Sequence, residues 1–233
     1  RTDTKVFIPF LKKLCNAYPV QRVVVDSGYE SEENYKFVDG SEQLSLFVKP
    51  ANHEQKKKRK YKTDIGRREN MAYDGEKDEY ICAQGRKLRA TAVKTRKSET
   101  GHVQKVTVYE CESCKECPVK EKCIRTKKTD KIPLEERIKR LNVSKYFACQ
   151  REAMEKKIST AEGILLRVNR SIQAEGVFAM IKEDMNFRRF LTRGNRNVQT
   201  EWYLVSMAYN IWKLHHKIQT GRLGSHLFAQ GAA

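Results

Sequence analysis

The sequence lacks any long hydrophobic run. No apolar stretch approaches the roughly 18 residues that a membrane-spanning helix needs, and the charged start has no apolar segment typical of a signal peptide. It also lacks a Walker loop, a dinucleotide-binding fingerprint and a Ser-His-Asp order. These absences argue against a membrane protein, a nucleotide-binding enzyme of these types and a serine hydrolase.

Acidic residues are scarce relative to basic ones. Asp and Glu total 29 against 47 Lys and Arg, which gives a net charge of +18 and a pI near 9.6. This excess favours a polyanionic partner, and nucleic acid is favoured over an anionic membrane surface. A chain of 233 residues can bury one sizeable core, or a core with a smaller inserted module.

The seven cysteines are unevenly spread. Cys15, Cys82 and Cys149 stand alone, and four others lie close together: Cys111, Cys114, Cys117 and Cys123. An odd total with one tight cluster favours a reducing compartment and a metal site over a disulfide framework. Four thiolates at this spacing can reach one tetrahedral zinc ion. An iron–sulfur cluster and the absence of any metal are the alternatives.

The first 50 residues read as an α/β unit. We expect a helix over Phe7–Ala17, a buried strand over Gln21–Val25 and a turn at Asp26–Gly28. A helix capped by Ser31 then runs to Val38, and a second strand covers Leu44–Val48.

Residues 51 to about 140 read as an insertion. The basic run Lys56–Lys60 has no apolar period, so it is equally well a solvated linker or a loop that contacts phosphates. Gly85 and Gly101 separate short antiparallel strands, which we expect at Tyr80–Cys82, Lys87–Arg89 and Val103–Tyr109.

From Ser144 the pattern is helical. We expect helices over Lys145–Glu162, Ser171–Met185 and Val198–Ile218, the last ending before Gly221. A basic connector, Phe187–Gly194, joins the second and third of these helices. The segment from Gly224 to Ala233 is weakly patterned and is predicted to be frayed.

Two carboxylates occupy positions suited to metal-dependent phosphate chemistry. Asp26 directly follows a buried strand, at the edge of the sheet where α/β folds place ligands, although an Asp can also simply form the turn. Glu175 borders the apolar face of its helix, with Lys182 about 20° away around a regular α-helix. An ordinary pair of surface residues is the alternative there.

These segments resemble bacterial insertion-sequence transposases with a DDE catalytic domain. Val25–Tyr29 with Ser31–Tyr35 is similar to the second-aspartate motif of that family, and Arg170–Lys182 followed by Arg188–Gly194 is similar to its glutamate motif. The cysteine insertion resembles one carried by a subgroup. Ala208–Asn210 in the last predicted helix is also similar to the sequence of this family.

The resemblance implies an RNase H-like mixed sheet with flanking helices, interrupted by a small β-rich, cysteine-containing insertion. It also implies three carboxylates that bind Mg²⁺ or Mn²⁺, with Asp26 as the second, Glu175 as the third and Lys182 on the DNA backbone. Ser171 stands where the family's signature has arginine, and Arg170 lies one place earlier. Asp3 precedes a helix and is not assigned, so the first aspartate is expected upstream of Arg1.

The expected organisation is an incomplete catalytic part at 1–50, the inserted module at 51–140, a helical completion at 141–220 and a flexible tail at 221–233. The expected function is cleavage and joining of double-stranded DNA at terminal inverted repeats by a homodimer in the bacterial cytoplasm, at the nucleoid. On this reading the chain alone binds DNA but cleaves it poorly. The expected DNA-contacting residues are Lys56, Lys57, Lys58, Arg170, Lys182, Arg188, Arg189 and Arg193. The alternative is a non-catalytic nucleic-acid-binding remnant or a zinc-bearing adaptor.

Overall fold

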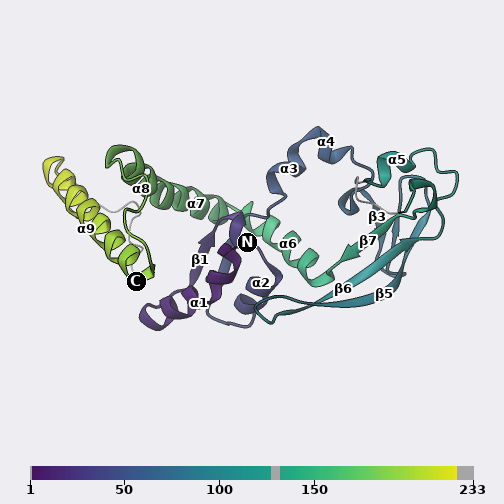
Figure 1. The fold of residues 1–233 in the computed structure, drawn as a ribbon, viewed down its shortest axis with the longest axis horizontal. Helices are drawn as coiled ribbons and strands as arrows, with labels where there is room; N and C mark the ends of the chain where they lie inside the picture. Colours follow the sequence, from purple (N-terminus) through teal and green to yellow (C-terminus); the bar gives the residue numbers. More distant parts are fainter. Residues whose placement is uncertain (1, 127–131, 225–233) are drawn as a thin grey trace. The chain divides into compact units, whose positions relative to one another are not determined.

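The computed structural model describes residues 2–126 and 132–224, and the chain divides into two compact units, Arg1–Arg167 and Val168–Ala233 (Figure 1). Helices and strands mix in the first unit, so the predicted α/β class is confirmed at that level. No helix in the described part of the chain has the length and apolar character needed to cross a membrane.

The first unit opens with the predicted strand–helix–strand arrangement. Helix α1 (Thr2–Ala17) leads into strand β1 (Arg22–Val25), the short 3₁₀ turn η1 (Ser27–Tyr29), helix α2 (Glu32–Asp39) and strand β2 (Ser45–Val48). The two strands pair in parallel, as a crossover through a helix requires. The hydroxyl of Ser31 accepts a hydrogen bond from the Asn34 N–H at 3.1 Å, so the predicted cap of α2 is confirmed.

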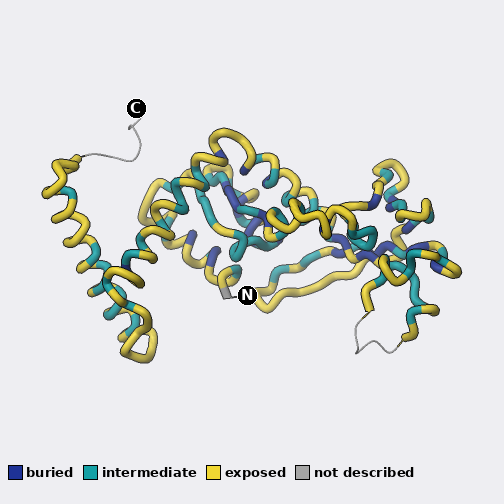
Figure 2. Tube along the Cα trace, turned by 90° about the horizontal axis from the view of Figure 1, so that it is seen from above, coloured by how far each residue is buried: buried dark blue, intermediate teal, exposed yellow. Residues whose placement is uncertain are grey.

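A first hydrophobic core joins these elements to a later helix, α6 (Lys145–Ile158). Ile158 is fully buried there. The dark blue segments in Figure 2 mark such buried positions. The other buried residues of this core come from α1, α2, β2 and α6: Phe7, Leu11, Tyr35, Val38, Leu46, Val48 and Met154.

The basic run is helical, so the expectation of a linker or loop is wrong. Two short helices, α3 (His53–Lys57) and α4 (Arg59–Lys62), cover it. Tertiary packing explains the difference, because Tyr61 is only 6% exposed and the Arg67 guanidinium lies 3.9 Å from the centroid of its ring. The Asn70 side chain also donates to the Tyr61 carbonyl at 2.7 Å. An isolated segment of this length would not hold a helix alone.

A five-stranded antiparallel sheet fills the middle of the chain. Its strands follow one another in sequence order: β3 (Ala72–Asp74), β4 (Glu79–Ile81), β5 (Lys87–Lys97), β6 (Val103–Cys111) and β7 (Arg140–Val143). The three predicted strands are confirmed, and Gly85 and Gly101 take the positive φ angles of their turns, 72° and 89°. Strands β3 and β7 were not predicted, and β5 extends eight residues beyond the predicted Arg89.

A second hydrophobic core lies on this sheet, around Leu88 and Tyr109, both fully buried. Two short elements flank it, the 3₁₀ turn η2 (Arg68–Asn70) and helix α5 (Lys120–Cys123); a third, η3 (Leu134–Glu136), precedes β7. Cys111 and Cys114 belong to the buried set of this core.

The predicted helix Lys145–Glu162 is in fact two helices. Helix α6 ends at Ile158, and α7 (Ala161–Arg170) begins after Ser159 and Thr160. The Thr160 hydroxyl accepts a hydrogen bond from the Gly163 N–H at 3.1 Å, which satisfies an amide at the start of α7. A Cβ on Gly163 would lie 2.3 Å from the Lys157 carbonyl oxygen, so glycine permits this close turn between the helices.

The second unit is helical. From the end of α7 the chain runs through π-helical segment η4 (Ser171–Glu175), helix α8 (Gly176–Ala179) and π-helical segment η5 (Met180–Asp184). The predicted connector follows, and helix α9 (Asn195–Gln219) begins after Gly194 at φ 83°. The rings of Phe178 and Trp202 stack at 6.0 Å, which joins α8 to α9. Of the predicted tail, residues 225–233 lie outside the described residues.

Candidate functional site

Asp26 lies at the carboxyl end of β1, where its side chain is exposed. Its Oδ1 accepts a hydrogen bond from the Gly28 N–H at 2.8 Å, so the carboxylate caps the η1 turn. The prediction that Asp26 forms the turn through its own side chain is therefore confirmed. It is compatible with ligand binding, because a carboxylate has about four lone-pair sites and one backbone amide uses one of them.

A second carboxylate lies beside this turn. A Cβ placed on Gly28 would be 2.9 Å from Asp26 Oδ1 and 3.0 Å from Asp3 Oδ2. Asp3, at the start of α1, and Asp26 therefore flank the same glycine. From the sequence Asp3 was left unassigned because the first carboxylate was expected at the end of a strand, and Asp3 lies in α1 instead. The pairing arises from α1 packing on η1, where the Phe7 and Tyr29 rings lie 6.0 Å apart.

A buried ion pair fixes the end of the same turn. The Arg151 guanidinium of α6 donates from Nε to Glu30 Oε1 and from Nη2 to Oε2, both at 2.8 Å. The Tyr35 hydroxyl and the Ala51 N–H donate to the same carboxylate at 3.1 and 2.8 Å. The Glu30 side chain is 1% exposed. These four bonds fix the backbone four residues after Asp26 against α2 and α6.

Glu175 lies in the second unit, on η4, and its side chain is 63% exposed. Its Oε1 accepts from Arg170 Nη1 at 3.1 Å and its Oε2 from the Ser171 hydroxyl at 2.9 Å. The expected 20° offset to Lys182 assumed a regular α-helix, whereas Glu175 and Lys182 lie on two π-helical segments with α8 between them. Both π-helical segments have wider turns with bonds to the fifth residue, which turn less per residue. Single π-helical turns are frequent at functional sites.

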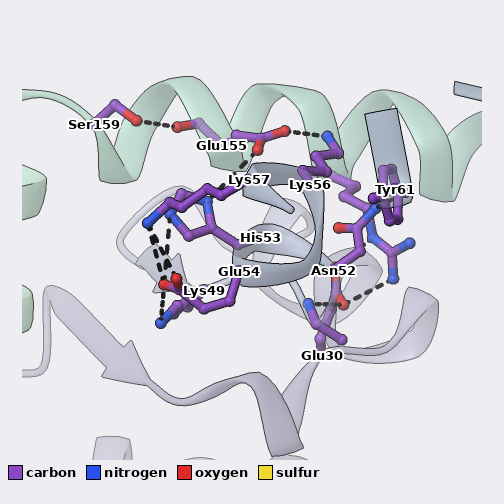
Figure 3. Close-up of polar contacts among 12 residues, drawn as sticks. Glu30, Lys49, Asn52, His53, Glu54, Lys56, Lys57, Tyr61, Glu155 and Ser159 are labelled. Carbon is purple, nitrogen blue, oxygen red and sulfur yellow. Dashed lines mark hydrogen bonds and ion pairs between the residues drawn. The ribbon is translucent and has the colours of Figure 1, made fainter. Parts of the chain in front are cut away.

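The lysines of the basic run differ in their contacts (Figure 3). Lys56 forms an ion pair with Glu155 of α6, and Lys57 contacts Glu54 at 3.2 Å. Lys49 reaches Glu54 as well, at 2.6 Å. Within the described residues, Lys58 forms no ion pair and is exposed. Lys58 is therefore the lysine of the predicted trio that is best placed to contact an external phosphate.

The basic residues of the second unit show the same contrast. Arg188 pairs with Glu183 at 3.0 Å and donates to Asn186 Oδ1 at 3.2 Å. Lys182, Arg189 and Arg193 are exposed, and none of them has an ion pair with another described residue. Arg170 uses its guanidinium on Glu175.

The clustered cysteines surround one small cavity in the first unit. The cavity has a volume of about 20 Å³, which is roughly the space of one water molecule. Burial raises the pKa of the Cys111 thiol to about 12 and also raises that of Cys123. The lining includes all four cysteines of the predicted cluster and one that was not expected, Cys82. Across the described ranges, no three His, Cys, Asp or Glu side chains are grouped so that they could hold a metal ion.

Comparison with known families decides between the broad classes of function. A family model described as "Transposase DDE domain" matches residues 81–215, more than half of the chain. The chain belongs to this DDE transposase family. No curated protein and no solved structure matches it. The resemblance seen in the sequence is thus confirmed at the level of the family.

The match covers part of the candidate site. Glu175, Lys182 and all the clustered cysteines lie inside the matched range of the DDE transposase domain, and Asp26 lies before it. Transposases act on DNA, and DDE domains generally use divalent metal ions. Asp26 in the first unit and Glu175 in the second each offer carboxylate oxygens, the ligand type that Mg²⁺ prefers.

Proposed function

We propose that this DDE transposase chain takes part in DNA transposition, by metal-dependent cleavage and transfer of DNA strands at transposon ends. The observation that carries the proposal is the family match over residues 81–215, which includes the segment from Arg170 to Lys182. The net charge of +18 supports a DNA partner independently, because it supplies the electrostatic, sequence-independent part of the affinity.

Asp26 and Glu175 would hold the divalent ions, Mg²⁺ or Mn²⁺. When bound, such ions activate the attacking oxygen and stabilise the leaving oxygen of a phosphodiester. The Gly28 N–H orients Asp26 at the end of β1, and the Glu30–Arg151 pair holds the backbone that follows. Arg170 and Ser171 each donate a hydrogen bond to Glu175 and so hold the orientation of this carboxylate.

Exposed cations without an internal ion pair would contact the DNA backbone. Lys182 and Arg189 meet this condition in the second unit, with Arg193, and Lys58 meets it in the first. Lys56, Lys57, Arg170 and Arg188 would contribute less, because each must first give up a carboxylate partner. We further propose that the DNA is the terminal inverted repeat and that a homodimer synapses two ends.

A structural zinc ion is proposed at the cysteine cavity, with ligands drawn from the cluster Cys111, Cys114, Cys117 and Cys123. The cavity has room for one ion. Since no group of three ligands is assembled among the described residues, the thiols would have to rotate toward the cavity as zinc binds. Such a site would stabilise a sheet with a small core of its own.

The test is strand cleavage by the full-length protein on a DNA fragment that carries the transposon end, with Mg²⁺ or Mn²⁺. Asp26→Asn and Glu175→Gln are each expected to lower the cleavage rate by at least about 100-fold, because a metal ligand is lost. The control is Asp184→Asn, an exposed carboxylate on the second π-helical segment, η5, which is separated from Glu175 on η4 by α8. Its rate is expected to stay within about twofold.

DNA affinity is measured in parallel to separate the two functions. Carboxylate variants that still bind DNA but no longer cut it support the catalytic roles. Full cleavage activity in both variants would refute them. A wild-type protein that binds DNA but never cuts it, with either metal, would favour the non-catalytic nucleic-acid-binding alternative.

A further inference from the structure

Strands β5 and β6 extend beyond the rest of their sheet (Figure 1). Strand β4 pairs with β5 only over Lys87–Arg89, and β7 pairs with β6 only over Thr107–Glu110. Among the described residues, Ala90–Lys97 of β5 and Val103–Val106 of β6 therefore have a neighbouring strand on one side only. These residues form a two-stranded arm, about 24 Å long from Ala90 to Lys97.

The arm is strongly basic. It contains no Asp or Glu and four basic residues: Lys94, Arg96, Lys97 and Lys105. All four are exposed, and none of them forms an ion pair with another described residue. The cations at the base of the ribbon differ, because Arg89 pairs with Glu79 at 3.4 Å and Arg140 pairs with Glu110 at 2.7 Å. The positive charge of the arm is thus available to an external anion.

The pairing register places these cations on both faces of the arm. Lys94 and Arg96 are two residues apart, so they share one face at a spacing of about 7 Å. Lys97 lies on the other face, and so does Lys105, which is paired with Thr95. Three of the four cations lie on β5, whose outer edge is unpaired over Ala90–Lys97 among the described residues. A chain of phosphates that follows this edge would meet them in succession.

The tip of the arm is fixed next to the turn that carries Asp26. Lys5 of α1 forms an ion pair with Glu99 in the loop between β5 and β6. The Thr100 hydroxyl of the same loop donates to Glu33 Oε2, at the start of α2, at 2.5 Å. The arm is therefore held by the helices that precede and follow the strand ending at Asp26, and it does not move as a free hairpin.

A groove of about 480 Å³ lies where the tip meets α1 and α2. Arg96 and Lys97 line it on the side of the arm, and Thr4 and Ser31 line it on the side of the helices. Its three carboxylates each have a partner within the protein. Arg96 and Lys97 are therefore the lining cations left for an external phosphate, and the groove continues the basic surface of the arm toward the Asp26 turn.

We infer that the two-stranded arm binds the phosphate backbone of double-stranded DNA and directs it toward the Asp26 turn. This inference rests on the proposed function and adds four residues to its DNA-binding surface. Each DNA strand carries one charge per about 3.4 Å, so the arm faces about seven phosphates of one strand and supplies four cations to them. A two-stranded ribbon is also narrow enough to enter the major groove, which is about 12 Å wide.

The competing explanation is that the charges only protect an exposed strand edge. Lysines on an unpaired edge prevent pairing with the strand of another molecule. The two explanations differ in what the loss of these charges does. Loss of DNA contacts weakens DNA binding, whereas loss of edge protection leaves DNA binding unchanged and causes self-association.

The experiment measures binding of the full chain to a fluorescent duplex of about 20 base pairs, longer than the arm at 3.4 Å per base pair. Divalent ions are left out so that no strand is cut, and affinity is measured from low to high salt. The arm variant carries glutamine at all four positions, Lys94→Gln, Arg96→Gln, Lys97→Gln and Lys105→Gln. It is expected to lower the affinity at least about 100-fold near 0.1 M salt and to reduce the salt slope by about three to four.

A second variant with the same loss of charge is the matched control. It replaces four exposed lysines of the first unit that lie outside the arm and form no ion pair with described residues: Lys13→Gln, Lys77→Gln, Lys115→Gln and Lys122→Gln. Charges farther from the DNA than about 10 Å are largely screened at this salt concentration. The control is therefore expected to lower the affinity by less than about 5-fold.

Two further measurements keep the test decisive if the arm variant does not fold. The single variants Lys97→Gln and Lys105→Gln should each reduce the salt slope by about one. Replacement of the three arm lysines by arginine keeps every charge and should keep the affinity within about 3-fold. Circular dichroism checks the fold of each variant, and analytical ultracentrifugation measures self-association.

The outcomes separate this inference from the proposed function. An arm variant that binds DNA like the wild type, in a protein that still cuts it, would overturn the arm and leave transposition standing. Equal losses in the arm variant and the matched control would also overturn it, because net charge alone would then explain the binding. Weakened binding by the arm variant of a protein that never cuts DNA would support the arm and refute only the catalytic roles. A wild-type chain that does not bind the duplex would overturn both.

Discussion

Removing Arg151 tests how the turn that carries Asp26 is held. In Arg151→Met the Glu30 carboxylate, 1% exposed, loses both of its 2.8 Å bonds from the guanidinium. It keeps the Tyr35 hydroxyl and the Ala51 N–H. Breaking a buried ion pair costs about 3–5 kcal/mol, because one charge is left without its partner. Since Arg151 itself is 22% exposed and water can reach part of the gap, we expect a loss near the lower figure, about 3 kcal/mol.

A double-mutant cycle isolates the pair. In a Glu30→Gln background the partner of Arg151 carries no charge, so Arg151→Met should cost only about 1 kcal/mol, which leaves a coupling energy of about 2 kcal/mol. Arg140→Met is the control. It breaks a 2.7 Å pair with Glu110 in which the arginine side chain is 62% exposed, and pairs of that kind contribute about 0–1 kcal/mol.

The assay is urea unfolding of the first unit, with circular dichroism and amide hydrogen exchange as the readouts. Both tryptophans, Trp202 and Trp212, lie in the second unit, so tryptophan fluorescence follows that unit separately. Loss of the Glu30–Arg151 pair should also lower metal-dependent cleavage at temperatures where the chain stays folded. Glu30 is four residues after Asp26, so the pair holds the backbone of the turn that carries Asp26. A change in unfolding free energy below about 1 kcal/mol for Arg151→Met would refute the reasoning.

Three further predictions concern other parts of the chain. Burial raises the pKa of Glu32, but hydrogen bonds from four neighbouring side chains have the larger combined effect, so its pKa lies below 4.5 in the folded protein. Ionised Glu32 therefore stabilises the fold above about pH 4.5, and this stabilisation is lost as the pH falls through the folded-state pKa. Glu32→Gln should therefore lower the urea midpoint at pH 7 and flatten its fall below pH 4.5, and an unchanged profile would contradict this. Arg189→Ala should reduce the slope of the logarithm of DNA affinity against the logarithm of salt concentration by about one. Arg188→Ala should change this slope by less, because Arg188 is already paired with Glu183. Fluorescence anisotropy of labelled DNA from low to high salt measures both slopes. Gly163→Ala should destabilise the first unit by about 1–3 kcal/mol, because the new Cβ would lie 2.3 Å from a carbonyl oxygen. Its matched control, Gly176→Ala, meets no atom within 4 Å and should raise stability by about 0.5–1 kcal/mol through helix propensity.

The elements that the sequence predicted well are those with a strong local signal. The β-branched run Arg22–Val25 and the Ser31 cap predicted β1 and α2 to within a residue or two, whereas α1 begins at Thr2, five residues before the predicted Phe7. Strand β5 was predicted short because Lys94 to Lys97 show no apolar alternation; its length depends on backbone pairing with β6, which a pattern of side chains does not reveal. Strand β7 follows a region of charged residues, and only its pairing with β6 makes it a strand.

Positions of candidate site residues could be predicted only where the sequence next to the residue indicates its place in the fold. Asp26 was found because it follows a strand, and the structure places it there. Cys82 was passed over because nothing in its sequence surroundings points to a cavity formed by residues about 30 positions later. The geometry around Glu175 was misjudged because a π-helical turn depends on packing and leaves no periodic trace.

The β5–β6 ribbon links the cysteine cavity to the helix that follows Asp26. At one end, Cys111 closes β6 beside the cavity. Seven residues earlier in β6, about 24 Å away along the strand, Gln104 donates to the buried Glu32 of α2 at 2.6 Å. The Glu32 carboxylate also accepts from Ser144, the cap of α6, at 2.5 Å. Both ends of the ribbon are therefore tied, and one buried carboxylate holds the sheet to the two helices that flank the Asp26 turn. The Glu32 carboxylate has four hydrogen-bond partners, so its position relative to β6 and α6 is more closely fixed than an apolar contact would fix it. We therefore expect that loss of the zinc ion proposed for the cysteine cavity would increase hydrogen exchange at α2 as well as in β4 to β6.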